Sequence, residues 1–156
     1  MGLPRGRWTL GVPLPMMNDL IAHIAKANGL AEPLARQALG ILLNGADRQG
    51  APLAAAVFRT LPGTRALAAR SGSETGAPTG EIARLIELTP GGRRRVVEHM
   101  FASLRNAGLD HAAASRLLPT IGSWMQDMYG IEGLGQLGAL IAHDAETSAA
   151  AAARAA

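Results

Sequence analysis

The residues whose types and spacing best suit chemistry are three consecutive arginines, Arg93, Arg94 and Arg95, which follow the pair Gly91-Gly92. Glycines let a backbone approach a ligand closely, and the free N–H groups of a helix's first turn attract anions. Guanidinium groups bind phosphate and carboxylate oxygens in a fixed fork geometry. The pattern predicts an anion-binding or partner-binding site at the start of a helix.

We nevertheless favour an ordinary solvated turn for the same residues, with the binding site as the alternative. Exposed cations in a first helical turn oppose the helix dipole, at about 0.3 to 1 kcal/mol each. Glu98 lies one turn after Arg94 and offsets part of that cost. If the turn does bind a ligand, we expect Arg84 and Arg105 to assist, and binding to fall steeply with salt.

A second motif, Gly133 to Gly138, has the spacing of the dinucleotide-binding fingerprint. That fingerprint works only where a strand precedes it and a helix follows, with an acidic residue about 20 positions on. Neither a strand nor such an acid is expected here. We interpret the glycines as small residues that allow close helix packing, and predict no cofactor.

The sequence contains no residue pattern that suits a metal site or a catalytic site. The four histidines, His23, His99, His111 and His143, show no ligand spacing, and the lack of cysteine excludes thiolate sites and disulfides. Glu98 and His99 are adjacent and therefore point to different faces of one helix. We predict no metal site and no enzymatic activity.

The periodicity of the apolar residues predicts an all-α fold, a compact bundle of about six to eight short helices in two similar halves with no β-sheet. Hydrophobic residues make up 48% of the chain but aromatic ones only 3%, so the core must be mainly aliphatic. Asn18 is the expected N-cap of the first helix and Asp110 that of a later one. The expected helices span residues 18–28, 33–43, 52–61, a short turn near 66–67, 81–88, 93–105, 110–129 with a kink or restart at Pro119, and 134–141.

One aromatic and thioether cluster, Trp124, Met125, Met128 and Tyr129, falls in the second half. An exposed, adaptable binding patch is one interpretation of such residues. Because two of the chain's five aromatic residues are concentrated there, we predict instead that these side chains belong to the core.

The expected domain organisation has three parts. Residues 1–16 read as a disordered leader or as a start placed upstream of the true one, residues 17–142 as the helical domain, and residues 143–156 as an Ala-rich flexible tail. Within the domain, residues 71–80 contain no apolar side chain larger than Ala or Pro, which predicts a linker between halves 17–70 and 81–142.

The two halves resemble each other when the chain is shifted so that Gly29-Leu30 falls on Gly108-Leu109. The same shift aligns Leu39 with Leu118 and Ile21 with Met100. Each half then reads as a helix, a Gly-Leu turn and a longer helix, as an internal duplication would produce. In a chain rich in Ala and Leu such matches also arise by chance, so both explanations stay open.

The net charge and hydropathy of the chain limit which partners and which cellular compartment can be expected. The net charge of +3 arises from 15 cations against 12 anions, too weak a field to argue for nucleic acid by itself. No run approaches the roughly 18 to 20 apolar residues of a membrane span. A soluble, cytoplasmic protein is expected, with export through the N-terminal segment as the alternative.

Two family resemblances follow from these segments. Residues 18–30, continuing to Ala35, Ala38 and Leu42, resemble the first two helices of the histone-like HU/IHF proteins. The strands and basic arm that carry that family's activity have no counterpart, so DNA binding is not implied.

The second resemblance covers more of the chain. Residues 39–43, 61–63, the Gly/Ser-rich middle, 108–110 and 118–130 are similar to small bacterial helical domains of unknown function, the VcgC/VcgE-like type. That resemblance implies an all-helical fold and no known catalytic residue or cofactor. We therefore expect a non-catalytic module that acts on an unknown protein partner or on a second copy of itself; nucleic-acid or anion binding through Arg93, Arg94 and Arg95 is the alternative.

Overall fold

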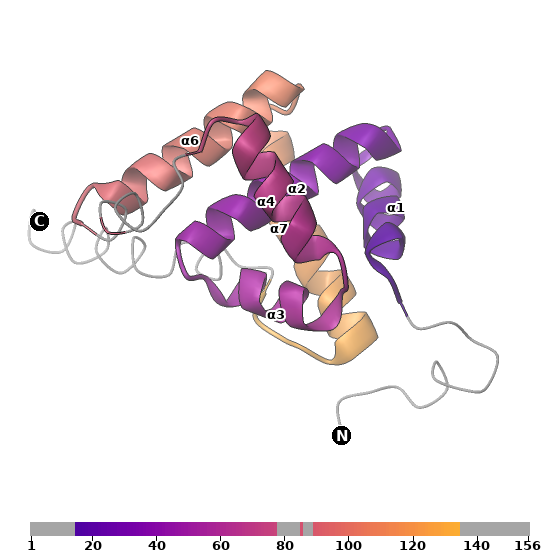
Figure 1. Ribbon diagram of the computed structural model, residues 1–156. Coiled ribbons are helices and arrows are strands. Elements are labelled where there is room, and N and C mark those ends of the chain that lie inside the picture. Colours follow the sequence, from indigo (N-terminus) through magenta and orange to yellow (C-terminus); the bar gives the residue numbers. More distant parts are fainter. Residues whose placement is uncertain (1–14, 78–84, 86–88, 135–156) are drawn as a thin grey trace, which may run out of the picture.

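Six helices make up the part of the chain that the computed structural model describes, residues 15–77, 85 and 89–134 (Figure 1). No strand occurs in these residues, and the predicted all-α fold is confirmed. The helices are α1 (Met17–Asn28), α2 (Glu32–Arg48), α3 (Pro52–Thr60), α4 (Thr64–Glu74), α6 (Gly92–Ala107) and α7 (His111–Tyr129).

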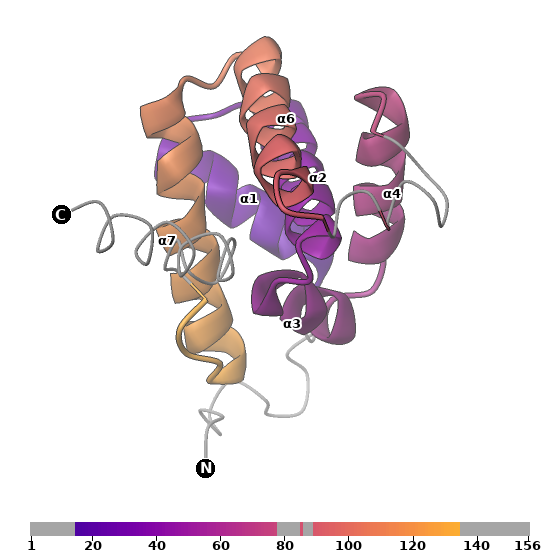
Figure 2. The ribbon, with the colours of Figure 1, turned by 90° about the vertical axis from the view of Figure 1, so that its left-hand side faces the viewer.

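Helix α2 lies at the centre of the fold. Its buried residues run from Ala35 to Ala46 and cover most of its circumference, so it can pack on several sides at once. It contacts α1, α3, α4 and α6, while α7 packs mainly against α1 (Figure 2). Pro33 occupies the first turn, where the missing N–H has no helical partner to lose.

The start of α1 differs from the prediction that Asn18 is the N-cap. The helix begins at Met17, and the carboxylate of Asp19 accepts a hydrogen bond from the Met16 N–H at 2.7 Å. Asn18 instead accepts a bond from Arg36 Nη2 at 2.8 Å, which ties α1 to α2. An acid inside the first turn therefore performs the capping that we assigned to the amide.

Two Gly-Leu turns of matching backbone geometry join α1 to α2 and α6 to α7. Gly29 and Gly108 both have positive φ, 65° and 112°. Beyond them, the Leu30 N–H donates to Ala25 O and the Leu109 N–H to Leu104 O, each at 2.9 Å. The two hairpins pack reciprocally, α1 against α7 and α2 against α6. This arrangement agrees with the two similar halves predicted from the sequence.

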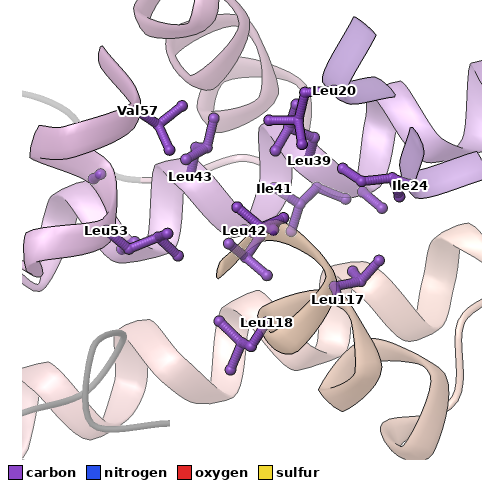
Figure 3. Close-up of a cluster of buried hydrophobic side chains, with 14 of the residues drawn as sticks. Leu20, Ile24, Leu39, Ile41, Leu42, Leu43, Leu53, Val57, Leu117 and Leu118 are labelled. Carbon is purple, nitrogen blue, oxygen red and sulfur yellow. The ribbon is translucent and has the colours of Figure 1, made fainter. Parts of the chain in front are cut away.

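A single hydrophobic core joins the two halves. Leu39 and Leu42 of α2 are fully or almost fully buried, as are Leu117 and Leu118 of α7, and Figure 3 shows these side chains gathered between the helices. The halves therefore do not form separate cores. Loss of packing in one half is expected to destabilise the other.

Helix α4 continues through the first part of the interval expected to be a linker, 71–80. Ser71 and Gly72 are buried, and the helix ends only at Glu74. A Cβ added at Gly72 would lie 2.5 Å from Asn44 Nδ2, and one added at Gly40 would overlap the Ser71 hydroxyl. The small residues allow α4 and α2 to approach closely, so their lack of apolar bulk reflects tight packing rather than solvent exposure.

One further expectation needs correction. Helix α7 runs unbroken through Pro119, whose ring is exposed, so the chain does not restart there. Leu85, which falls in the expected helix 81–88, is 64% exposed. The rest of the expected helices 81–88 and 134–141, apart from the buried Leu134, lies outside the described residues, as do residues 1–14 of the leader and the whole tail.

Candidate functional site

The arginine turn, Gly91 to Arg95, is placed where the sequence predicted it, at the start of α6. Gly91 adopts a φ of 113°, which favours glycine, and the helix begins at Gly92. The Gly92 N–H donates to Thr89 O at 3.0 Å, and the Arg95 N–H donates to Gly91 O at 3.2 Å. Arg94 and Arg95 are exposed; the side chain of Arg93 lies outside the described set.

The helpers expected for this turn do not gather around it. Arg105 stands in the last turn of α6, about 15 Å along the helix axis from Arg95 at 1.5 Å per residue. Arg84 lies outside the described residues. Arg94 and Glu98, both exposed, form no ion pair with each other. The turn thus presents two exposed guanidinium groups rather than a converging pocket.

The neighbourhood of the turn lowers the electrostatic cost of its cations. The last turn of α2 and the first turn of α6 lie at the same end of the molecule in both views (Figures 1 and 2). The C-terminal carbonyl groups of a helix carry a partial negative charge that favours nearby cations. The arginines therefore need no bound anion to be tolerated there.

The histidines are spread over the fold. His23 and His111 are exposed, and the His111 ring packs against Phe101 with centroids 4.9 Å apart. His99 is half-buried on α6, and its Nε2 atom is buried without a hydrogen-bond partner among the residues that the structure describes. Among the described residues no group of three or more His, Cys, Asp or Glu side chains is placed to hold a metal ion.

A second surface lies where α1 begins and α7 ends, and the sequence indicated only its Met128 and Tyr129 part as a possible binding patch. We call it the methionine end and define it by Met16, Met17, Met128 and Tyr129. Met16 is 50% exposed, and the other three are half-buried against the core. Methionine is flexible and polarisable, and it is typical of surfaces that adapt to a partner.

Contacts from three parts of the chain hold the methionine end together. The Tyr129 hydroxyl donates to Pro15 O at 3.4 Å, which joins the end of α7 to the residues before α1. A Cβ added at Gly63 would lie 3.5 Å from the Met17 Cε, so the Met17 side chain reaches the turn between α3 and α4. The surface is therefore built from segments distant in sequence.

Tyr129 also has a shifted acidity. Burial raises the pKa of the Tyr129 phenol above its ordinary value, and the nearby Asp19 carboxylate adds to the increase. The neutral phenol can keep donating its hydrogen bond under conditions where a free tyrosine begins to ionise. The methionine end is thus coupled to the acid that caps α1.

The aromatic and thioether cluster divides between the core and this surface. Trp124 and Met125 are buried, at 5% and 0% exposure, which confirms the core interpretation for these two residues. Trp124 meets the Tyr129 ring edge-on with centroids 6.0 Å apart. Met128 and Tyr129 lie at the margin, where the core reaches the surface.

The dinucleotide-like glycine motif lacks the required context in its described part. Helix α7 precedes it, rather than a strand, and Gly133 and Leu134 follow in a loop. Residues 135–138 of the motif lie outside the described residues.

Comparisons with protein-family models, curated proteins and solved structures return no match at a significant level. The likeness to VcgC/VcgE-like domains and to HU/IHF helices stays a prediction from the sequence. Within the described residues, no helix is both long and apolar enough to span a membrane.

Proposed function

We propose that this protein is a non-catalytic helical module, of the small bacterial type that it resembles, which acts by protein–protein contact or by self-association through the methionine end. The observation that carries the proposal is the half-exposed Met16 beside the half-buried Met17, where the Tyr129 hydroxyl joins the end of α7 to Pro15. Among the described residues, Met16 and Leu85 are the large hydrophobic side chains classed as exposed. Of these two, Met16 belongs to a fixed cluster.

The physical case rests on the contrast between this surface and the rest of the exterior. Exposed apolar side chains lose their contact with water when a partner covers them, at about 25 cal/mol per Å² of apolar area. Methionine side chains adjust their rotamers to partners of different shape. The cluster lies on rigid helix ends, so little backbone ordering is needed on binding.

Sedimentation velocity of the full chain at low and high salt, with and without mixed-sequence duplex DNA, tests this proposal. We expect a species larger than the monomer, or a partner complex, that salt does not dissociate and that Met16→Asp removes. The matched control is Ala22→Asp, at an exposed position of the same helix, and it should leave the species intact. A strict monomer with no partner recovered from cell extract contradicts the proposal.

Weak binding of anions or nucleic acid at the arginine turn is the second candidate. Its support is the pair of exposed arginines, Arg94 and Arg95, on a helix whose first turn holds no acid. Binding of this kind weakens steeply with salt, with a slope near the number of phosphates contacted. In the same experiment it predicts a shift with DNA at low salt that the double variant R94Q/R95Q abolishes. A shift that survives this variant excludes the turn.

A further inference from the structure

Positive charge is concentrated next to the methionine end. Residues 48–73 contain four arginines and no acidic residue. Three of them, Arg59, Arg65 and Arg70, are exposed on α3 and α4. Neither the Arg59 nor the Arg65 side chain has a hydrogen bond or ion pair to another residue of the described chain. Among the described residues, this corner therefore lacks a counter-charge.

The Arg65 guanidinium is held in place by an aromatic ring. Its Cζ lies 4.6 Å from the centroid of Phe58, a half-buried residue that packs against the core. Stacking of this kind leaves the N–H groups at the edge of the guanidinium plane free to bind a carboxylate side-on. Less side-chain freedom is lost on binding than for a solvated arginine.

The turn that carries Arg65 is itself rigid. Thr64 is fully buried, and its hydroxyl donates to Leu61 O at 2.7 Å, which fastens the first turn of α4 to the end of α3. The Met17 side chain lies close to this turn at Gly63, where an added Cβ would be 3.5 Å from the Met17 Cε. The arginine corner, defined as Arg59 and Arg65 with their turn, is thus continuous with the methionine end.

The small residues around these cations favour a protein partner over nucleic acid. Ala66 and Ala69 are exposed beside Arg65 on α4, and Pro62 is exposed in the turn. Protein interfaces usually combine apolar side chains at the centre with polar and charged side chains at the rim. Two guanidinium groups would contact only about two phosphates, which gives nucleic acid a weak hold.

Acidic residues are also present at this end. Asp19 is engaged in capping α1, and Asp127 is exposed in the last turn of α7. A partner therefore gains most when its carboxylates meet the α3–α4 side, where Arg59 and Arg65 lie.

We infer that the methionine end and the arginine corner together form a docking surface for a protein segment that combines apolar side chains with carboxylates, such as an acidic amphipathic helix. Apolar side chains of that segment cover Met16 and Met17, and its carboxylates reach Arg59 and Arg65. The inference rests on the proposed function and adds the class of partner.

In the test, a short synthetic amphipathic peptide rich in Leu and Glu is titrated into the full chain, and calorimetry measures its binding. The comparison probes are the same peptide with Gln in place of Glu, and duplex DNA. We expect the Glu peptide to bind, and the double variant R59Q/R65Q to weaken it about tenfold, since two exposed ion pairs are lost. The control R105Q/R116Q changes two exposed arginines elsewhere and should change affinity less than twofold. Circular dichroism checks that each variant folds.

The outcomes separate the two proposals. Equal binding of the Glu and Gln peptides, lost in Met16→Asp but not in R59Q/R65Q, overturns the docking inference and leaves the proposed function standing. Binding of DNA that competes with the Glu peptide and needs Arg59 and Arg65 overturns the choice of a protein partner. Absence of binding by either peptide overturns the inference, and a strictly monomeric chain without partners then removes the proposed function as well.

Discussion

The first turns of α1 and α6 begin two hairpins with the same Gly-Leu turn, but different contacts fix these two first turns in place. At α1, Asp19 caps the helix, and Met17 and Pro15 contact other parts of the chain. At α6, the bonds among described residues are local backbone bonds from Gly92 and Arg95, and the first turn carries cations where α1 carries an acid. The two hairpins therefore have the same Gly-Leu turn geometry, but their helices begin with different contacts and charges.

The difference indicates where a preorganised binding surface is available. A fixed surface binds a partner with a smaller loss of conformational freedom than one held by local contacts alone. The methionine end meets this condition because three segments of the chain support it. The arginine turn presents charge without such support.

The largest expected effect comes from two buried core residues at matching positions of the hairpins, Ile21 on α1 and Met100 on α6. Changing either residue to Ala is expected to lower the free energy of unfolding by about 3 kcal/mol. Because one core joins the halves, urea denaturation followed by circular dichroism should show a single transition in both variants. The exposed control Gln126→Ala should stay within about 0.5 kcal/mol. Separate transitions for the two hairpins would refute the common core.

The two turn glycines provide the next comparison. A new Cβ at Gly29 or Gly108 meets no atom within 4 Å, so the cost of an Ala arises from the backbone alone. We expect a loss of about 1 to 2 kcal/mol. The loss should be larger at Gly108, whose φ of 112° lies further from the left-handed helical value. Thermal unfolding measures both variants, and an unchanged Gly108→Ala protein would contradict the assigned turn geometry.

Removing the charge at each helix start should change stability by a smaller amount, with opposite signs at α1 and α6. Asp19→Ala is expected to lower stability by about 1 kcal/mol, because the Met16 N–H loses its acceptor. Arg94→Gln should raise stability by about 0.3 to 1 kcal/mol, because it removes a cation from the positive end of the helix dipole without placing a second carboxylate one turn before Glu98. High salt should shrink the second effect. A stabilising Asp19→Ala would show that this carboxylate does not cap α1.

The smallest expected effect concerns the pH dependence of the methionine end. Tyr129 is the single tyrosine, so phenolate absorbance reports it alone. Burial first, and Asp19 second, raise its pKa, so Asp19→Asn should lower that pKa only in part. A raised pKa means that the folded state holds the proton more tightly than the unfolded state. Its contribution to stability is present below the ordinary tyrosine pKa and is lost as the pH rises through the folded-state value, a loss that Tyr129→Phe should lack.

Much of the fold followed from the sequence because apolar periodicity and glycine punctuation act locally. The start of α2, the position of α3, the two Gly-Leu turns and the cap at Asp110 are examples: the Asp110 carboxylate accepts from the Ala113 N–H at 2.7 Å. The expected end of α2 before Asn44-Gly45 was wrong, because the helix continues to Arg48. The expected linker misled because Ser71 and Gly72 resemble solvent-exposed residues in composition. Their burial depends on Gly40 and Asn44 of α2, which no local pattern reveals.

The candidate site was less accessible to sequence reasoning. The arginine turn could be located from its residue types, but the separation of Arg105 from it is a matter of helix length. The methionine end was missed because Pro15 and Met16 were assigned to the leader. Its assembly depends on the contacts of Tyr129 with Pro15 and of Met17 with the turn at Gly63. The adjacent Met16-Met17 pair was the available signal.

The most direct test of the methionine end against the arginine turn is photo-cross-linking in cells, with a photoreactive amino acid placed at position 16 or at position 94 of the full chain. We predict a discrete cross-linked protein species from position 16 that is absent from position 94. Cross-links from position 94 alone, to nucleic acid or to protein, would contradict the account and identify the arginine turn as the functional surface.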